Sequence, residues 1–240
     1  MSKLKLRPPR KREAFHKPHK QGGQHGLTGQ GPKRKNILGA SASASGRGEK
    51  ATRDEPPLEQ YYQALFSAFG PQRWWPGETQ FEVIVGAILT QNTSWTNVER
   101  AIANLRAARL LTPAAMTRAP INTLEELIRS SGYFRQKARK LKAFSEFLRV
   151  EFRGSLKRMF ETPTAALREK LLGVFGIGPE TADSILLYAG QHSVFVVDAY
   201  TKRMLARHGW VQEQAPYEEV RSMVERQFPG ETPRSMSFTR

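Results

Sequence analysis

Apolar side chains recur with a helical period of about 3.6 residues along most of the chain from Pro57 onward. The first stripe predicts a helix over 57–69, which Gly70 and Pro71 would end. Residues 81–89 are apolar on nearly every face, which indicates a buried helix. Further helices are expected over about 95–108, 122–130, 136–152, 164–173, 179–189, 199–208 and 216–227. The pattern therefore predicts an all-α fold with short connections.

One apolar segment, Val194–Val197, has the residue types of a β-strand. Partner strands are not evident in the pattern, so we interpret the segment as a buried extended connector. Asp198 follows it directly, at the start of the next predicted helix. This carboxylate is either the N-cap of that helix or a partly desolvated functional acid, and the two roles are compatible.

A second candidate feature is the Gly176-Ile177-Gly178 turn between two predicted helices. Glycines on both sides of Ile177 allow positive φ and a close approach of the backbone to another molecule. Ile177 can then anchor the turn in the core, while free N–H groups at the next helix start face outward and can bind a phosphate. A plain interhelical turn is the alternative.

Composition narrows the function. The 240 residues include no cysteine, which excludes a disulfide framework, a thiolate zinc site, an iron–sulfur cluster and a cysteine nucleophile. The longest apolar run, Val83–Leu89, is far shorter than a membrane span, and the basic N-terminus has no apolar segment typical of a secretory signal. The formal charge of +16 favours a polyanionic partner, with nucleic acid as the first candidate.

Most of this charge lies in residues 1–55, whose 14 Lys+Arg and 4 Asp+Glu give a net charge of +10. The segment lacks apolar periodicity and is rich in Gly, Ser, Pro and His, so we predict a disordered basic tail that raises nonspecific affinity for nucleic acid. A solubilising leader is the alternative. The folded domain is expected over residues 56–240.

Two further stretches carry short motifs, in a fixed order with the hairpin and Asp198. Val85–Thr93 ends an apolar helix with Thr-Gln-Asn-Thr, and Ser131–Ala138 reads Ser-Gly-Tyr-Phe-Arg-Gln-Lys-Ala. Gly176–Ala182 reads Gly-Ile-Gly-Pro-Glu-Thr-Ala, and Asp198 comes eighteen residues after Glu180. Together they resemble the glutamine, Lys-Ala, helix-hairpin-helix and aspartate motifs of the endonuclease III superfamily of DNA glycosylases, over about residues 57–228.

The resemblance implies a two-lobed helix-hairpin-helix glycosylase fold. A six-helix lobe would span about 80–190, and a second lobe would pair the 57–69 helix with residues 199–240. The DNA groove would lie between the lobes, with Asp198 at its mouth. The family normally supplies a further closing helix, which we expect to be missing after 228.

The resemblance also implies chemistry. Asp198 would be the catalytic acid that stabilises positive charge on the deoxyribose. The bifunctional members carry a lysine nucleophile where this chain has Glu180, and a carboxylate cannot form the imine. The resemblance therefore implies a monofunctional glycosylase, and its 3-methyladenine branch suggests an alkylated base. The base pocket would consist of Trp74, Trp75, Pro76, Trp95 and Glu180.

These roles have simpler alternatives. The tryptophans can fill the core, and the helix dipole alone favours an acid at Glu180. DNA contacts are expected from Gln91, which would fill the gap left by a flipped nucleotide, and from the hairpin. The hairpin contacts are the N–H groups of Ile177, Gly178 and Glu180. The full set of predicted DNA-binding residues is Gln91, Gly176, Ile177, Gly178, Thr181 and Lys137.

No iron–sulfur cluster or other metal site is expected, although the family often holds a monovalent cation at the hairpin. The predicted partner is double-stranded DNA containing a damaged base, bound by a monomer and not at a membrane. A cytoplasmic, nucleoid-associated location is expected, with a nuclear one left open. Two alternatives remain: a noncatalytic DNA-binding protein that has lost its last helix, and an endonuclease III-like lyase that uses another amine.

Overall fold

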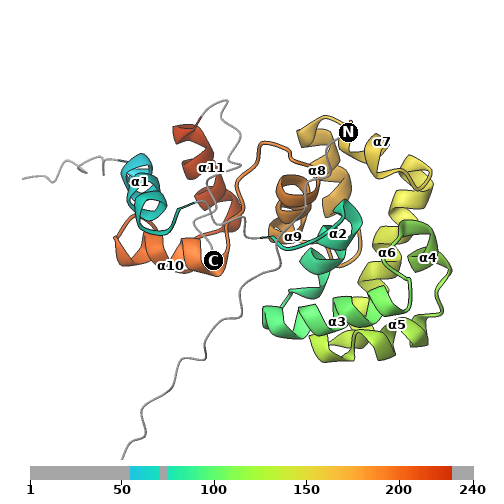
Figure 1. Cartoon of the computed structure of the whole chain (residues 1–240). Helices are drawn as coiled ribbons and strands as arrows, with labels where there is room; N and C mark the ends of the chain where they lie inside the picture. The colour runs from blue at the N-terminus through green and yellow to red at the C-terminus, as the bar shows by residue number, and fades with distance from the viewer. Residues whose placement is uncertain (1–54, 71–74, 229–240) are drawn as a thin grey trace, which may run out of the picture. The chain divides into compact units, whose positions relative to one another are not determined.

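All secondary structure in the computed structural model is helical across the residues that it describes, 55–70 and 75–228 (Figure 1). These residues form no β-strand, which confirms the predicted all-α fold class. The predicted tail over 1–55 lies almost wholly outside the described residues, as do Trp74 and the chain after 228. The helices are α1 Leu58–Phe69, α2 Gln80–Leu89, α3 Trp95–Ala107, α4 Pro113–Arg118, α5 Ile121–Leu127, α6 Phe134–Phe152, α7 Leu156–Phe160, α8 Thr164–Leu172, α9 Pro179–Ser184, α10 Ala199–Arg207 and α11 Tyr217–Gln227.

Two short helices, α4 and α7, were not predicted, because their six and five residues are too few to display a helical period. Each is started by a side-chain cap instead: the hydroxyl of Thr112 accepts the Ala115 N–H, and that of Ser155 accepts the Arg158 N–H. The helix predicted over 179–189 is split into α9 and a π-helical segment, η2, at Ile185–Ala189. A short 3₁₀ helix, η1, occupies Arg129–Ser131.

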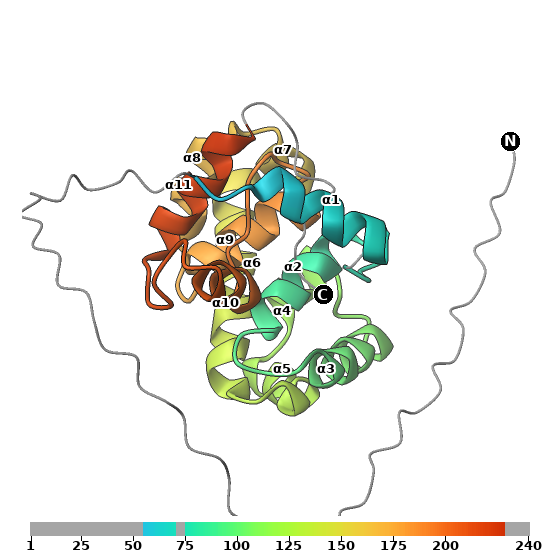
Figure 2. The same cartoon turned by 90° about the vertical axis from the view of Figure 1, so that its left-hand side faces the viewer.

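Helix α2 lies at the centre of the larger hydrophobic cluster, as its uniformly apolar sequence predicts. Every one of its residues from Phe81 to Leu89 is buried. It packs against α3, α6, α9 and η2. Figure 1 shows α2 between α9 and α6 with α3 below it, and Figure 2 gives the view turned by 90°. Burial on all sides fixes the direction in which α2 ends, and therefore the position of Gln91 just beyond it.

A smaller hydrophobic cluster gathers α1, α10 and α11. Leu58 of α1 packs there with Phe195 and Val197 of the connector that precedes Asp198. Val194, at the other end of this connector, belongs to the larger cluster. The segment Val194–Val197 has no assigned secondary structure and pairs with no strand in the described chain, and three of its four side chains are buried, as expected of a buried connector. The connector therefore passes from one hydrophobic cluster to the other immediately before Asp198.

The described helices include none that is long and apolar enough to cross a membrane.

The prediction that Lys137 of α6 contacts DNA is wrong. Its side chain is only 2% exposed, and its Nζ donates to the carbonyl oxygens of Leu89 at 2.9 Å and Ser131 at 2.6 Å. Burial, with a smaller contribution from the charge of Lys140, lowers the pKa of Lys137 to about 8. The ammonium group satisfies carbonyls at the ends of α2 and η1, so it is not available to a DNA phosphate.

Replacing Lys137 with Met should destabilise the fold without weakening DNA binding by the folded protein. The substitution keeps the apolar stem but leaves two buried carbonyl oxygens without their donor, at a cost of about 2–3 kcal/mol in the free energy of unfolding. Urea unfolding measures the loss, and Arg139→Ala, at an exposed neighbour on α6, should change it by about 0.5 kcal/mol or less. Weaker DNA binding with unchanged stability would contradict the structural role.

Candidate active site

The hairpin between α8 and α9 has the geometry that its glycines predict, with one difference. Gly176 has a φ of 80°, a left-handed conformation that favours glycine, and the Ile177 side chain is anchored in the core at 4% exposure. Gly178 has ordinary extended backbone and open space on its Cα. Within the described chain, the N–H groups of Gly178 and Glu180 donate to no acceptor, so they are free for a ligand.

Ile177 is the exception among the three predicted N–H donors. Its N–H donates to the carbonyl oxygen of Val174 at 3.0 Å and closes the hairpin turn. The prediction that this group grips a phosphate is therefore wrong for this conformation. Ile177 shapes the hairpin through its buried side chain and this turn hydrogen bond.

Gln91 lies directly against the hairpin. Its Nε2 donates to the Gly176 carbonyl oxygen at 3.1 Å and to the Thr181 hydroxyl at 2.9 Å, and its Oε1 accepts from the Nζ of Lys140. The Thr181 side chain is buried, so its hydroxyl holds Gln91 rather than facing a phosphate as predicted. Insertion of Gln91 into a DNA stack stays a prediction and requires these three hydrogen bonds to be exchanged.

Lys140 is the hairpin cation that the sequence analysis missed. Its aliphatic stem lies under Gly176, where an added Cβ would overlap it. The ammonium group forms no ion pair with any described acid. The one signal for Lys140 in the sequence is its spacing of three residues from Lys137, because residues three apart are neighbours on the surface of a helix. The motif lysine is buried, and Lys140 brings a charge to the hairpin.

Asp198 combines the two roles left open above. It is the N-cap of α10, and its Oδ1 accepts the Thr201 N–H at 2.8 Å. Burial raises the pKa of Asp198, while hydrogen bonds from Thr201, Tyr200 and its own backbone lower it less than burial raises it. The carboxylate is therefore capped and partly desolvated at once, which is the environment of a functional acid.

Glu180, in the first turn of α9, is electrostatically coupled to Asp198. Burial, followed by the charge of Asp198, raises the pKa of Glu180, and the charge of Lys202 opposes the shift. The side chain keeps contact with solvent, yet the surrounding protein atoms desolvate its carboxyl group. Because the charge of Asp198 acts on Glu180, ionisation of one carboxyl group disfavours ionisation of the other.

Trp75 and Trp95, the two predicted base-pocket tryptophans that the structure describes, form one cluster with Tyr188. Trp75 stacks on Tyr188 of η2, with ring centroids 4.9 Å apart, and meets Trp95 edge to face at 5.5 Å. Both tryptophans are half-buried against the larger hydrophobic cluster, as the core-filling alternative expects, while Pro76 is exposed. Tyr188 had no sequence signal beyond an aromatic residue in an apolar helix. Stacking of a damaged base on these rings stays a prediction.

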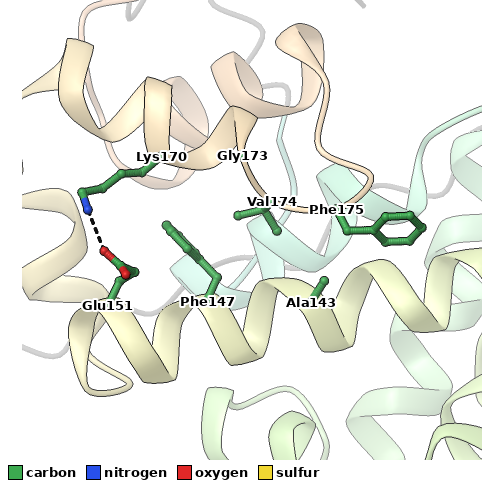
Figure 3. Close-up of a pocket in the computed structure, with 7 residues that line it drawn as sticks. All are labelled: Ala143, Phe147, Glu151, Lys170, Gly173, Val174 and Phe175. Carbon is green, nitrogen blue, oxygen red and sulfur yellow. Dashed lines mark hydrogen bonds and ion pairs between the residues drawn. The ribbon is translucent and has the colours of Figure 1, made fainter.

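A pocket beside the start of the hairpin, at residues 173–175, contains none of the predicted site residues. It lies between α6 and the end of α8, and Figure 3 shows Phe147 and Val174 facing each other across it. The ion pair of Lys170 with Glu151, at 2.6 Å, closes one end, and the exposed Phe175 lies at the other. Its two titratable groups, Lys170 and Glu151, are paired with each other, so the pocket has no unpaired acid or base for catalysis.

The described residues contain no group of three His, Asp or Glu side chains able to hold a metal ion. The monovalent cation implied by the resemblance would need hairpin carbonyl oxygens. Those of Val174 and Gly176 already accept hydrogen bonds from Ile177 and Gln91. Each carbonyl oxygen has a second lone pair, so a cation at the hairpin stays a prediction.

Asp183 of α9 is a further residue that the sequence analysis missed. It is fully buried, and Arg168 of α8 donates to both of its carboxylate oxygens, at 2.7 and 3.0 Å. A signal was present, because a single acid within the apolar run 181–189 predicts a buried charge that needs a partner.

Asp198→Asn should raise the melting temperature at pH 7 by a few degrees, since the amide keeps an N-cap acceptor and removes a partly desolvated charge. The folded pKa of Asp198 lies above its unfolded value of about 3.9, so the ionised acid costs stability as pH rises through the folded pKa. Thermal unfolding from pH 3.5 to 8 should show the gain vanish at the acid end. A lower melting temperature at pH 7 would contradict it. Glu219→Gln, at an exposed acid of α11, is the control.

Comparison with known proteins agrees with this geometry. A protein of Methanocaldococcus jannaschii, provisionally named as a DNA repair glycosylase, is 49% identical over 170 residues, 70% of this chain and 77% of its own. The Helicobacter pylori 3-methyladenine DNA glycosylase bound to 1,N6-ethenoadenine is 32% identical, with a TM-score of 0.63 over 70% of this chain and 80% of that one. A trapped endonuclease III–DNA covalent intermediate shares the fold, with 21% identity and a TM-score of 0.62 over 72% and 77% of the two chains. Residues 85–229 match the family model of HhH-GPD superfamily base excision DNA repair proteins. The chain therefore belongs to the HhH-GPD superfamily of base excision DNA repair proteins.

Proposed function

We propose that this protein is a monofunctional DNA glycosylase that releases alkylated, 3-methyladenine-like bases from double-stranded DNA and leaves an abasic site. The observation that carries the proposal is the partly buried carboxyl group of Asp198 at the N-cap of α10, together with a second carboxyl group, Glu180, in the first turn of α9. Glu180 stands where the bifunctional members carry their lysine. The likeness to the Helicobacter pylori enzyme supports the choice of an alkylated base.

The chemistry needs little from the protein when the base already leaves well. The bond between C1′ and the base nitrogen breaks, and the base takes the electron pair. An alkylated purine that carries positive charge leaves as a neutral molecule and requires no proton from the site. The ionised carboxylate of Asp198 stabilises the positive charge that develops on the deoxyribose. A water molecule then adds to C1′, and its proton passes to Asp198.

Binding to DNA is proposed to start at the hairpin. The free N–H groups of Gly178 and Glu180 are suited to phosphate oxygens, and Lys140 adds a positive charge beside them. Several of the similar structures are DNA complexes, which supports duplex DNA as the partner. We propose that Gln91 exchanges its hydrogen bonds to the hairpin for contacts with DNA and fills the gap left by the flipped nucleotide.

The predicted activity is tested with methylated DNA, which contains the positively charged base 3-methyladenine, and with a defined duplex that contains the uncharged base 8-oxoguanine. Mass spectrometry should detect release of the methylated base and not of 8-oxoguanine, and the strand should break only after alkali because the product is an abasic site. Borohydride should trap no covalent complex, since the carboxylate of Glu180 cannot form an imine.

Two results would overturn parts of the proposal. Binding to lesion duplexes without base release, even at high protein concentration, would favour the noncatalytic alternative. A borohydride-trapped complex would favour the lyase alternative. Lys202 is then the amine to test with Lys202→Met, because its charge acts on Glu180 although its Nζ is bound to the Ala215 carbonyl oxygen at 2.8 Å.

A further inference from the structure

The hydroxyl group of Tyr217 joins three segments that are far apart in the sequence. Tyr217 is the first residue of α11. Its hydroxyl donates to Oδ2 of Asp183, in α9, at 2.9 Å. The same oxygen accepts the N–H of Val197 at 3.3 Å, and Val197 immediately precedes Asp198. One phenol therefore connects the helix that follows the hairpin to the backbone that carries the proposed catalytic acid.

The Asp183 end of this connection is rigidly held. Arg168 binds the Asp183 carboxylate through two hydrogen bonds, and both side chains are largely shielded from water, with Asp183 fully buried. Such a two-bond pairing fixes the plane of the carboxylate as well as its position. Arg168 also donates to Glu218 at 2.6 Å, so the first turn of α11 is tied to α8 beside Tyr217.

The Val197 end determines where the Asp198 carboxylate can lie. The Val197 side chain is buried in the smaller hydrophobic cluster, and its N–H is held by the phenol. On the other side, Oδ1 of Asp198 is held by the Thr201 N–H. The acid is thus fixed from both directions along the chain. Displacement of a reacting group by about 1 Å can reduce a rate by about a hundredfold.

The phenol remains a donor throughout the useful pH range. Burial, followed by the negative charge of Asp183, raises the pKa of Tyr217 well above that of free tyrosine, and the charge of Glu180 adds to the effect. Tyr217 therefore keeps its proton at neutral pH and remains a hydrogen-bond donor to Asp183.

We infer that Tyr217 is a positioning residue for Asp198. Through its hydroxyl, the rigid Arg168–Asp183 pair holds the backbone that carries the catalytic acid. Its hydroxyl does not contact substrate. It holds the Val197 amide so that the Asp198 carboxylate meets the deoxyribose in one geometry. The inference rests on the proposed glycosylase function, since it assigns a role in that reaction.

The test is Tyr217→Phe, which keeps the ring and removes the hydroxyl. The single-turnover excision rate at saturating protein should fall by about 10- to 100-fold, because the acid loses its anchor. Affinity for an abasic-site duplex should change by about threefold or less, because the hairpin contacts are untouched.

Tyr61→Phe is the matched control. Tyr61 packs in the same smaller cluster, and its hydroxyl likewise accepts one hydrogen bond, from Trp210 Nε1 at 2.9 Å. Both variants lose a tyrosine hydroxyl from this cluster, so a general loss of stability would slow both. The inference requires that only Tyr217→Phe slows excision, at a temperature well below both melting temperatures.

Asp183→Asn serves as a second variant, measured well below its own melting temperature because it removes the buried charge that pairs with Arg168. It weakens the anchor of the phenol and should reduce the excision rate with unchanged DNA affinity. Combined with Tyr217→Phe, it should reduce the rate little further. Wild-type protein that releases no base would overturn the proposed function itself. An active wild type with Tyr217→Phe within twofold of its rate, or with Tyr61→Phe equally slow, would overturn this inference alone.

Discussion

The buried carboxylate of Asp183 is the constraint on which the arrangement around Asp198 depends. A desolvated charge has to be met by a cation and by hydrogen bonds, and removal of one partner from such a pair costs about 3–5 kcal/mol. Arg168 and the Tyr217 hydroxyl meet that requirement here. Helices α8, α9 and α11 are consequently tied together, and the N–H of Val197 is fixed with them. The need to pair the buried charge of Asp183 thereby determines the position of Asp198.

A second group of polar contacts prepares the hairpin before DNA arrives. Lys137 satisfies the carbonyl oxygen of Leu89 at the end of α2, and Gln91 then meets the hairpin at Gly176 with the help of Lys140. Because the Gln91 amide has its partners within the protein, its predicted entry into DNA exchanges existing hydrogen bonds for new ones. The conformation of the hairpin and the position of this glutamine are therefore energetically coupled.

Local chemistry explains which features were predictable. The all-α class, the buried α2 and the cap at Asp198 follow from apolar period and residue type, so the sequence was sufficient for them. Lys137 matches the Lys-Ala motif of the family but does not make the predicted DNA contact. Its burial depends on how α6 packs against α2, which the sequence pattern does not contain. The roles of Lys140 and Tyr217 depend on contacts between residues about 35 to 50 positions apart, which no local pattern contains.

The central claim is that the Asp198 carboxylate performs the chemistry of this site. It is tested most directly by single-turnover excision of an alkylated base by wild-type protein and Asp198→Asn, both saturating the same duplex. The amide retains the cap of α10 but cannot stabilise positive charge on the sugar, so excision should fall by about a hundredfold or more while DNA affinity is retained. Excision by Asp198→Asn at the wild-type rate would contradict the account and remove Asp198 from the mechanism.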